Sequence, residues 1–417
     1  MLSDEVIDKV VERLTNRIEQ ANQYVLMQIG KKIKQIYNMT PTQAQKLIQV
    51  LKYGGDYEKI TRKLAEITKL NIKDIKKIFE EIAKNDYEFA KQFYDYRNKK
   101  YIPFEENTAL QRQIEAIRVL TENKYIDLAR TKALGFSVRN NKGKVIFKGL
   151  KQVYNEAIDK AVLSVVQGKD TFYNNMHQIL KDIGESGLKT LDYESGRSMR
   201  LDSAIRMHME DAIKQLHNET QQQIGKEFDS DGVEITVHLN PAPDHERVQG
   251  KQFSIKEFNK FQNDIDCYSY DGEFFSHEHN GHDRRSISEL NCKHYTFAII
   301  LGVNIPQYTN KQLQDIIKKN EKGFDFEGKH YTMYDGTQLQ RQIEREVRKQ
   351  KDLQIYGLTS GDDKLVRDSQ SKIKILNKKY KQISEASNLP TKMQRMRVSG
   401  YKRTHIWLFL KNDIYFI

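Results

Sequence analysis

The chain has 417 residues, 30% of them charged and 38% hydrophobic, and a formal net charge of +12. This length suffices for two or three domains with buried cores, and the 22 Tyr and 18 Phe residues argue against a disordered chain. Two cysteines, Cys267 and Cys292, are too few for a disulfide framework, and no apolar run reaches the roughly 18 residues that a membrane span requires. We therefore expect an ordered, helix-rich protein of a reducing compartment with no membrane span.

The first 130 residues have the apolar spacing of helices. A seam with alternating spacings of four and three predicts a first helix of about thirty residues, and it consists of Ile7, Val11, Leu14, Ile18, Ala21 and Val25. Thr40 precedes Pro41, which predicts a second helix start because a hydroxyl can cap the first turn and proline is tolerated there. We expect a wholly helical domain over residues 1–130.

Helical periodicity continues over residues 131–228, where we expect a second helical domain. One face of a helix that should end near Gly168 carries Val153, Ala157, Ala161 and Val165. A long amphipathic helix is then predicted by Leu201, Ile205, Ala212 and Leu216.

The pattern changes at Gly232. The segment "GVEITVHL" alternates apolar and polar residues and predicts a half-buried strand with Val233, Ile235 and Val237 inward. The following sequence is rich in Gly, Asn, Asp and His, which predicts a small mixed domain over residues 229–330. The helical period returns in a basic segment over residues 331–417, where Glu344 precedes Arg348 by four residues, a favourable order on a helix. The predicted fold class is α+β and predominantly α-helical.

Positive charge is concentrated near the C-terminus. From Lys364 to Arg403 the chain has twelve Lys and Arg residues against two Asp and Glu residues. Such a segment favours phosphate or an acidic protein surface, although a solvated helix face can have the same composition. The candidate contact residues are Lys372, Lys374, Lys378, Lys379, Lys381, Arg395 and Arg397. The apolar end "HIWLFLKNDIYFI" is interrupted by polar residues, so we expect a docked strand or a partner contact there.

Eight potential metal ligands fall within about sixty residues: His238, His245, His277, His279, His282, His294, Cys267 and Cys292. Structural zinc sites usually contain two close ligand pairs at wider spacings than those found here. The alternative is that the cysteine is a small buried hydrophobe and the histidines are loop or capping groups. These spacings leave metal binding open, and we expect no other cofactor.

Two patterns in the same region resemble catalytic motifs. "HEHNGH" does not fit the metalloprotease motif H-E-x-x-H, because Asn-Gly signals a turn and not a helix. Cys292 and His294 would share one face of a strand, which allows a Cys-His contact, but the sequence offers no third orienting group.

Four stretches in order resemble the phage minor capsid protein 2 family, which is related to the Mu F-type minor head proteins. The helix beginning "YNEAIDKAV" comes first, and the stretch "YESGRSMRLDSAIR" follows with Tyr193, Ser195, Gly196, Arg197 and Arg206. The loop "NPAPDHERVQGKQFS" then contributes His245, Gln249, Gly250 and Lys251 in an H-x-x-x-Q-G-K element. The last stretch, "NCKHYTFAIILGV", contributes Asn291, Cys292 and His294.

The resemblance implies a structural component of the phage head that acts in head assembly or at the portal vertex, without enzymatic activity. It would be present in the host cytoplasm during assembly. Some relatives carry an appended toxin domain, which we do not expect here. The expected partners of the chain are the portal or major capsid protein and, non-specifically, packaged DNA. The chain departs from the family before His245 and before Asn291, which argues against a demanding catalytic or metal-binding geometry. We therefore interpret one set of residues as a structural clasp between two distant segments: His245, Gln249, Gly250, Asn291, Cys292 and His294. The alternative is a metal-dependent nuclease or peptidase carried in the virion, using His245, Cys292 and His294.

Overall fold

The computed structural model describes residues 4–44, 46, 55–69, 72–140, 142–167, 169–191, 196–279, 281–288, 292–398 and 401. Several residues used in the sequence predictions lie outside this part, or have side chains outside it: Ile7, Leu14, Gly168, Tyr193, Ser195, Asn291 and the apolar end 405–417. The described chain is mainly helical with small antiparallel sheets, which confirms the predicted fold class. No described helix has the length and hydropathy needed to cross a membrane.

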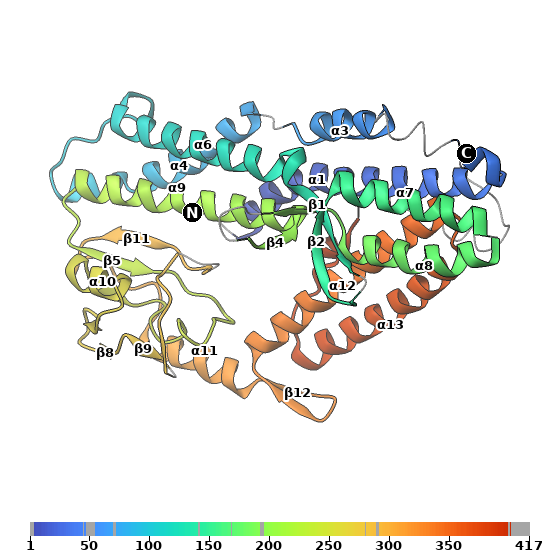
Figure 1. Ribbon diagram of the computed structural model, residues 1–417. Helices are drawn as coiled ribbons and strands as arrows, with labels where there is room; N and C mark the ends of the chain where they lie inside the picture. The colour runs from blue at the N-terminus through green and yellow to red at the C-terminus, as the bar shows by residue number, and fades with distance from the viewer. Residues whose placement is uncertain are drawn as a thin grey trace.

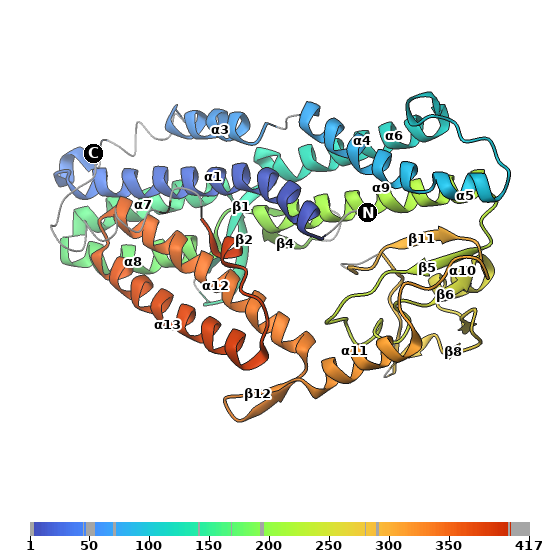
Figure 2. The same cartoon turned by 180° about the vertical axis from the view of Figure 1, so that it is seen from behind.

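The predicted first helix is α1 (Asp4–Tyr37). Its seam is buried at Val11, Ile18, Ala21 and Val25, as the spacing predicts. The predicted start at Thr40 is also present, because Thr40 Oγ1 accepts a hydrogen bond from Gln43 N at 3.3 Å and residues 41–44 are helical. The next elements are α3 (Gly55–Ile67), α4 (Ile72–Phe89), α5 (Lys91–Tyr96) and α6 (Thr108–Ala129). Figure 2 shows α1 running through the molecule, with α3 and α4 on one side and α12 and α13 on the other.

A small sheet, which the periodicity did not predict, interrupts the second helical stretch. Its strand order is β2-β1-β3-β4, with the bounds Val145–Gly149, Leu134–Arg139, Lys189–Leu191 and Ser198–Arg200. The turn between β1 and β2 forms because Asn140 Oδ1 accepts from the backbone amides of Lys142 and Lys144, each at 3.0 Å, and Gly143 has φ +75°. The surrounding helices are α7 (Leu150–Gln167), α8 (Lys169–Ser186) and α9 (Leu201–Glu227). The predicted apolar faces of α7 and α9 are buried.

The mixed region lies beneath α9 at one end of the molecule (Figure 1). Its sheet has the order β11-β5-β6, formed by Thr296–Ile299, Gly232–Ile235 and Gln252–Ser254. The predicted strand is β5, but it ends at Ile235, and Val233 and Val237 are only partly buried. The other elements are α10 (Ile255–Gln262), α11 (Asn310–Lys322) and two short pairs, β7 (Cys267–Tyr268) with β8 (Phe274–Phe275) and β9 (Glu278–His279) with β10 (His282–Asp283).

The C-terminal part is a helical hairpin preceded by a short β-hairpin. The elements are β12 (Phe324–Phe326), β13 (Lys329–Tyr331), α12 (Met333–Ser360) and α13 (Asp363–Ser387). Thr332 and Asp335 form a capping box at the start of α12, and Gly361 ends the helix in the left-handed conformation. Asp362 then caps α13, because its side chain accepts from Leu365 N. The turn between the two helices is therefore set by local residues.

Hydrophobic burial divides the described residues into three cores. The largest joins α1, α4, α6, α7, α8 and α9 with Leu353, Tyr356 and Leu365. A second lies between α12, α13 and the β-hairpin. The third is confined to the mixed region and contains Ile235, Val248, Phe253, Phe261, Cys267, Phe275 and Ile287. Tyr295 and Ile300 of the mixed region belong to the largest core, so the mixed region packs against the helical part there. The four-part division of the chain stays a prediction.

A buried ion network ties α1, α9 and α12 together. Arg200 donates to Asp352 at 2.8 Å and to Asp202 at 3.1 Å, and Arg348 donates to Asp202 at 2.8 Å. Burial alone would raise the pKa of Asp202, but the two arginines lower it to about 2. Burial, together with Asp202, raises the pKa of Glu19 to about 7. The favourable spacing of Glu344 and Arg348 is not used as an ion pair: Glu344 accepts from the Tyr380 hydroxyl at 2.9 Å, while Arg348 bonds Asp202.

Candidate functional site

The loop from Pro241 to Lys251 is a series of tight turns. His245 N donates to Ala242 O at 3.0 Å, and Gln249 N donates to His245 O at 3.1 Å, which turns the His245 and Gln249 side chains inward. Gly250 follows with φ +69°, in the left-handed region that glycine enters without strain. A Cβ atom at this position would lie 2.6 Å from Leu313 Cδ2, so the Leu313 side chain would have to shift to admit one.

The clasp residues of this loop meet Cys292 and His294 in the buried interior. Cys292 Sγ lies 3.4 Å from His245 Nδ1 and 3.4 Å from His294 Nδ1. His294 Nε2 is 3.2 Å from Gln249 Oε1, and the same oxygen accepts from His238 N at 2.8 Å. The structure thus places four of the six clasp residues in one cluster, His245, Gln249, Cys292 and His294. Gly250 packs beside Leu313 and Val237, and Asn291 lies outside the described residues.

One detail of the predicted clasp is wrong. Cys292 and His294 were expected on a strand, but residues 292–295 have no regular structure and lead into β11. They are held beside β5 by backbone pairing of Thr236 N with Tyr295 O at 2.9 Å. Cys292 Sγ accepts from His294 N at 3.4 Å, so a local turn brings the thiol and the imidazole together.

The electrostatics of the cluster follow from its burial. His245, Cys292 and His294 are 1%, 2% and 3% exposed. Burial lowers the pKa of His294 to about 2 and also lowers the pKa of His245. Burial raises the pKa of the Cys292 thiol, which is the opposite of what a thiolate nucleophile needs. In this state the cluster is neutral and poorly suited to nucleophilic catalysis.

Two arginines that the sequence interpretation missed secure the loop. Arg285 binds both carboxylate oxygens of Asp244, at 2.6 and 2.8 Å, and Arg284 donates to Asp244 O at 2.8 Å. His245 Nε2 lies 2.6 Å from Arg285 O. Although burial opposes it, the Arg285 bonds lower the pKa of Asp244. The adjacent arginines in "GHDRRS" were the available signal, but their partner lies forty residues away in the sequence.

The remaining potential ligands do not join the cluster. Cys267 belongs to the small core, and His277 bonds Asp266 at 2.8 Å. His279 and His282 are register partners in the β9–β10 hairpin, which confirms a turn in place of the metalloprotease helix. His238 packs edge-on against His294, with ring centroids 4.8 Å apart, and its Nε2 lies 2.6 Å from Lys293 O.

A cavity of about 510 Å³ adjoins the cluster. It lies between the mixed region and α12, and its lining includes His245, Cys292, His294, Tyr334 and Arg395. The three potential metal ligands therefore line a partly open pocket despite their small exposed area.

Comparison with known proteins identifies the family of the chain. A model of the phage minor capsid protein 2 family matches residues 2–383. The chain belongs to this family. A search of curated proteins and of solved structures found no match. Membership makes the chain a phage minor capsid protein, a structural component of the virion that interacts with other head proteins.

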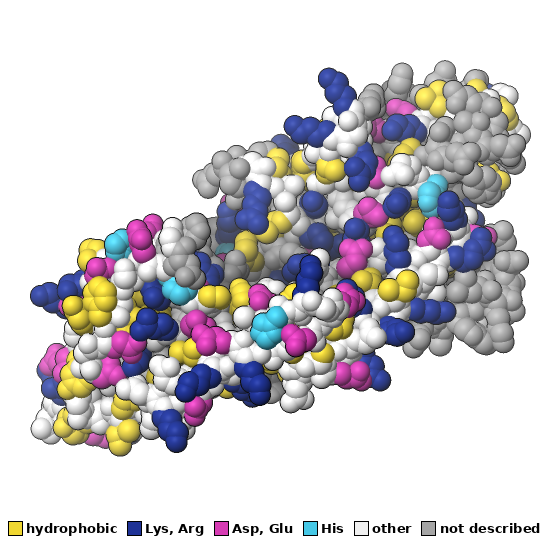
Figure 3. All heavy atoms as spheres, turned by 90° about the horizontal axis from the view of Figure 1, so that it is seen from below, with side chains coloured by type: hydrophobic (Ala, Val, Ile, Leu, Met, Phe, Trp, Pro, Cys, Tyr) yellow, Lys and Arg dark blue, Asp and Glu magenta, His cyan; other side chains and the backbone are white. Residues whose placement is uncertain are grey.

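The predicted basic residues of this minor capsid protein lie on α13 and just beyond it. Lys372, Lys374, Lys378 and Lys381 are exposed on α13, and Arg397 is exposed after it, whereas Lys379 and Arg395 are partly buried. Lys379 pairs with Glu327 at 2.8 Å, and Arg395 lines the cavity beside the clasp. In the view from below, Lys and Arg side chains are interleaved with Asp and Glu (Figure 3). The predicted group therefore contains both exposed and paired residues.

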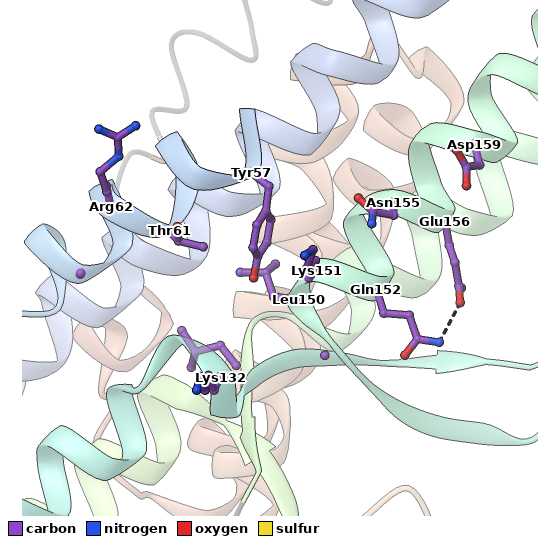
Figure 4. Close-up of a pocket in the computed structure, with 13 residues that line it drawn as sticks. Tyr57, Thr61, Arg62, Lys132, Leu150, Lys151, Gln152, Asn155, Glu156 and Asp159 are labelled. Carbon is purple, nitrogen blue, oxygen red and sulfur yellow. Dashed lines mark hydrogen bonds between the residues drawn. The ribbon is translucent and has the colours of Figure 1, made fainter. Parts of the chain in front are cut away.

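A second, larger cavity of the minor capsid protein, about 950 Å³, lies between α3, α7 and the start of β1. Tyr57 projects from α3 toward Leu150 at the start of α7, and Gln152 bonds Glu156 at 3.0 Å on the rim (Figure 4). Arg62 and Asp159 lie at opposite ends of the opening (Figure 4). Its polar groups do not converge on one point, so the clasp is the stronger candidate site.

Proposed function

We propose that the protein acts in head assembly at the portal vertex, where α13 faces packaged DNA. The observation that carries this proposal is a stripe of exposed cations along one side of α13. We call it the α13 stripe, and it consists of Lys364, Arg367, Lys374, Lys378 and Lys381. The opposite face of α13 is buried through Leu365, Val366, Ile373, Tyr380 and Ile383. The stripe is therefore held outward by a helix whose other side is fixed.

The dimensions of the stripe suit a phosphate backbone. From Lys364 to Lys381 the helix rises about 26 Å at 1.5 Å per residue, a length over which one DNA strand carries about seven phosphates. Lys374 and Lys378 have no acidic partner within ion-pair distance among the described residues. Binding through such residues is non-specific and salt-sensitive, because it rests on counterion release. An acidic surface of the portal or major capsid protein is the alternative partner.

The test is retention of the purified full chain on double-stranded DNA at a series of salt concentrations. The triple substitution Lys374→Gln, Lys378→Gln and Lys381→Gln should weaken binding equally for all sequences. It should also reduce the slope of log affinity against log salt by about one for each lysine that no longer neutralises a phosphate.

A matched control removes three exposed lysines from the opposite side of the molecule, Lys59, Lys63 and Lys76 on α3 and α4 (Figure 1). This control lowers the net charge equally, so unchanged binding would assign the effect to the α13 stripe. Equal weakening of DNA binding in both variants would show that binding depends only on the net charge of the protein and not on the α13 stripe. Absence of DNA binding at low salt would indicate that the α13 stripe binds a protein. Copurification with the portal or major capsid protein would then identify that partner.

We also propose that the clasp is a structural and not a catalytic element. The burial of Cys292, with a raised thiol pKa, supports this role. Substitution of Cys292 by Ser should leave assembled heads infectious when the protein folds. Loss of infectivity with unchanged folding and incorporation would instead favour the enzymatic alternative.

A further inference from the structure

The strongest unexplained feature is the pair of imidazoles that point at one sulfur. His245 Nε2 faces the backbone oxygen of Arg285, and a carbonyl oxygen only accepts hydrogen bonds. His294 Nε2 faces Gln249 Oε1, which is fixed as an oxygen because it also accepts from His238 N. Each neutral imidazole therefore carries its proton on Nε2, and both Nδ1 lone pairs face Cys292 Sγ.

One thiol cannot satisfy this arrangement. A thiol has a single proton and can donate to only one of the two Nδ1 atoms, although each lies 3.4 Å from Sγ. Cys292 Sγ already accepts a hydrogen bond from His294 N. The sulfur and the two Nδ1 atoms therefore all present lone pairs to one another. A buried acceptor without a donor is unfavourable, and a cation between the three atoms would satisfy all of them.

We infer that His245 Nδ1, Cys292 Sγ and His294 Nδ1 bind one divalent zinc-class ion. The three ligand atoms all lie within 4.8 Å of one another. Zinc–sulfur and zinc–nitrogen bonds of about 2.3 and 2.0–2.1 Å in a tetrahedron place sulfur and nitrogen about 3.5 Å apart, close to the spacing found here. Imidazole and thiolate ligands select zinc over magnesium or calcium.

The residues around the three ligands supply the hydrogen-bond acceptors that metal-bound histidines usually have. Such histidines usually donate the other ring N–H to a carbonyl or carboxylate, which fixes the tautomer and the ring. Arg285 O and Gln249 Oε1 occupy these two positions. Water from the adjoining cavity can complete the fourth position, and on binding the thiol loses its proton to solvent.

This ion would fasten two segments of the mixed region that polar side chains and the small apolar core also join. His245 lies 47 residues before Cys292 in the sequence. The site goes beyond the proposed contact with DNA, because it makes no use of the α13 stripe. Its role is to stabilise the clasp, which gives a second reason for the presence of Cys292 and His294 in a structural protein.

The experiment is titration of the metal-free full chain with Co²⁺, followed by competition with Zn²⁺. We expect one equivalent to bind, with the near-ultraviolet charge-transfer absorption of a cobalt thiolate. Cys292→Ser should abolish this absorption, and Cys267→Ser is the matched control because Cys267 is the other buried free cysteine of the mixed region. Gln249→Ala should weaken binding about 10–100-fold by freeing the His294 ring. Absence of stoichiometric binding to the folded wild type, or an unchanged spectrum in Cys292→Ser, would overturn the site.

A second measurement needs no variant and covers the case in which Cys292→Ser does not fold. The wild-type chain is alkylated with and without Zn²⁺, and each cysteine is quantified by mass spectrometry. At a Zn²⁺ concentration about ten times the dissociation constant, alkylation of Cys292 should slow about tenfold, while Cys267 is unaffected. Equal rates at Cys292 with and without Zn²⁺ would contradict the proposal.

Discussion

The helical body and the mixed region differ in what stabilises them. The body is held by one large core that joins its long helices and also receives Tyr295 and Ile300 from the mixed region. The mixed region has a core of seven buried residues and strands of two to four residues. It therefore relies on polar side chains that join segments distant in the sequence, such as His294 with Gln249. Burial of regularly spaced apolar side chains stabilises the body, whereas a few specific hydrogen bonds stabilise the mixed region.

The largest effect should come from breaking the ion network of the body. Asp352 is 1% exposed and accepts hydrogen bonds from Arg200 and Gln23. Asp352→Ala leaves the Arg200 guanidinium with less compensation in a buried site, so we expect a loss of about 3–5 kcal/mol of unfolding free energy. Urea unfolding followed by far-ultraviolet circular dichroism measures it. The control Asp368→Ala removes an exposed acid inside α13, away from its first turn, and should change stability by less than about 0.5 kcal/mol.

Gln249→Ala tests the mixed region in the same way. It removes the acceptor of both His294 Nε2–H and His238 N–H, and we expect a loss of about 2–4 kcal/mol confined to the mixed region. Hydrogen exchange should accelerate between residues 232 and 299 while α1 and α12 stay protected. Gln314→Ala, at an exposed position of α11, is the control. Acceleration across the whole chain would show that the two regions unfold together and would remove the contrast.

Gly250→Ala should cost about 1–3 kcal/mol, because a positive φ and a collision act together. Gly272 is a suitable comparison, since it has φ +85° but no atom within 4 Å of a built Cβ. Gly272→Ala should therefore show the cost of the backbone conformation alone, about 1 kcal/mol. Thermal unfolding of both variants gives the packing contribution by difference. Equal destabilisation would indicate that Leu313 moves aside.

The smallest expected effect depends on pH. Because burial raises the folded-state pKa of Glu19 to about 7, from 4.5, ionisation of Glu19 destabilises the folded state. This destabilisation grows as pH rises from about 4.5 to about 7 and is constant above that. Glu19→Gln should therefore stabilise the protein relative to wild type at pH 8 by on the order of 1–2 kcal/mol, and by less at pH 5. An equal difference in unfolding free energy between Glu19→Gln and wild type at both pH values would show that another group of the network takes up the proton.

The sequence predicted the elements that local periodicity determines. The seam of α1, the cap at Thr40 and the buried faces of α7 and α9 were all confirmed. The β1–β2 hairpin was missed because its strands, of six and five residues, lie between two stretches with helical periodicity. The favourable order of Glu344 and Arg348 on α12 did not lead to an ion pair, because tertiary partners on α13 and α9 compete with the helical neighbour.

For the candidate site, the motifs identified the residues but not their environment. The elements around His245 and Cys292 were recognisable in the sequence, and the structure places them within 3.4 Å of each other. The part played by Arg284 and Arg285 could not be predicted, because their partner Asp244 is brought near only by the folded loop. The tautomers likewise depend on oxygen atoms of Arg285 and Gln249, which no spacing rule reveals.

The contact of α1 with α12 has a consequence for synthesis on the ribosome. Gln23 and Asp352 are hydrogen-bonded across 329 residues of sequence. At about 5–20 residues per second, the first helix waits roughly 16–66 s for this partner to emerge. During that interval the side of α1 that α12 will cover is exposed to the cell, so a nascent-chain chaperone has both the time and an apolar surface on which to act.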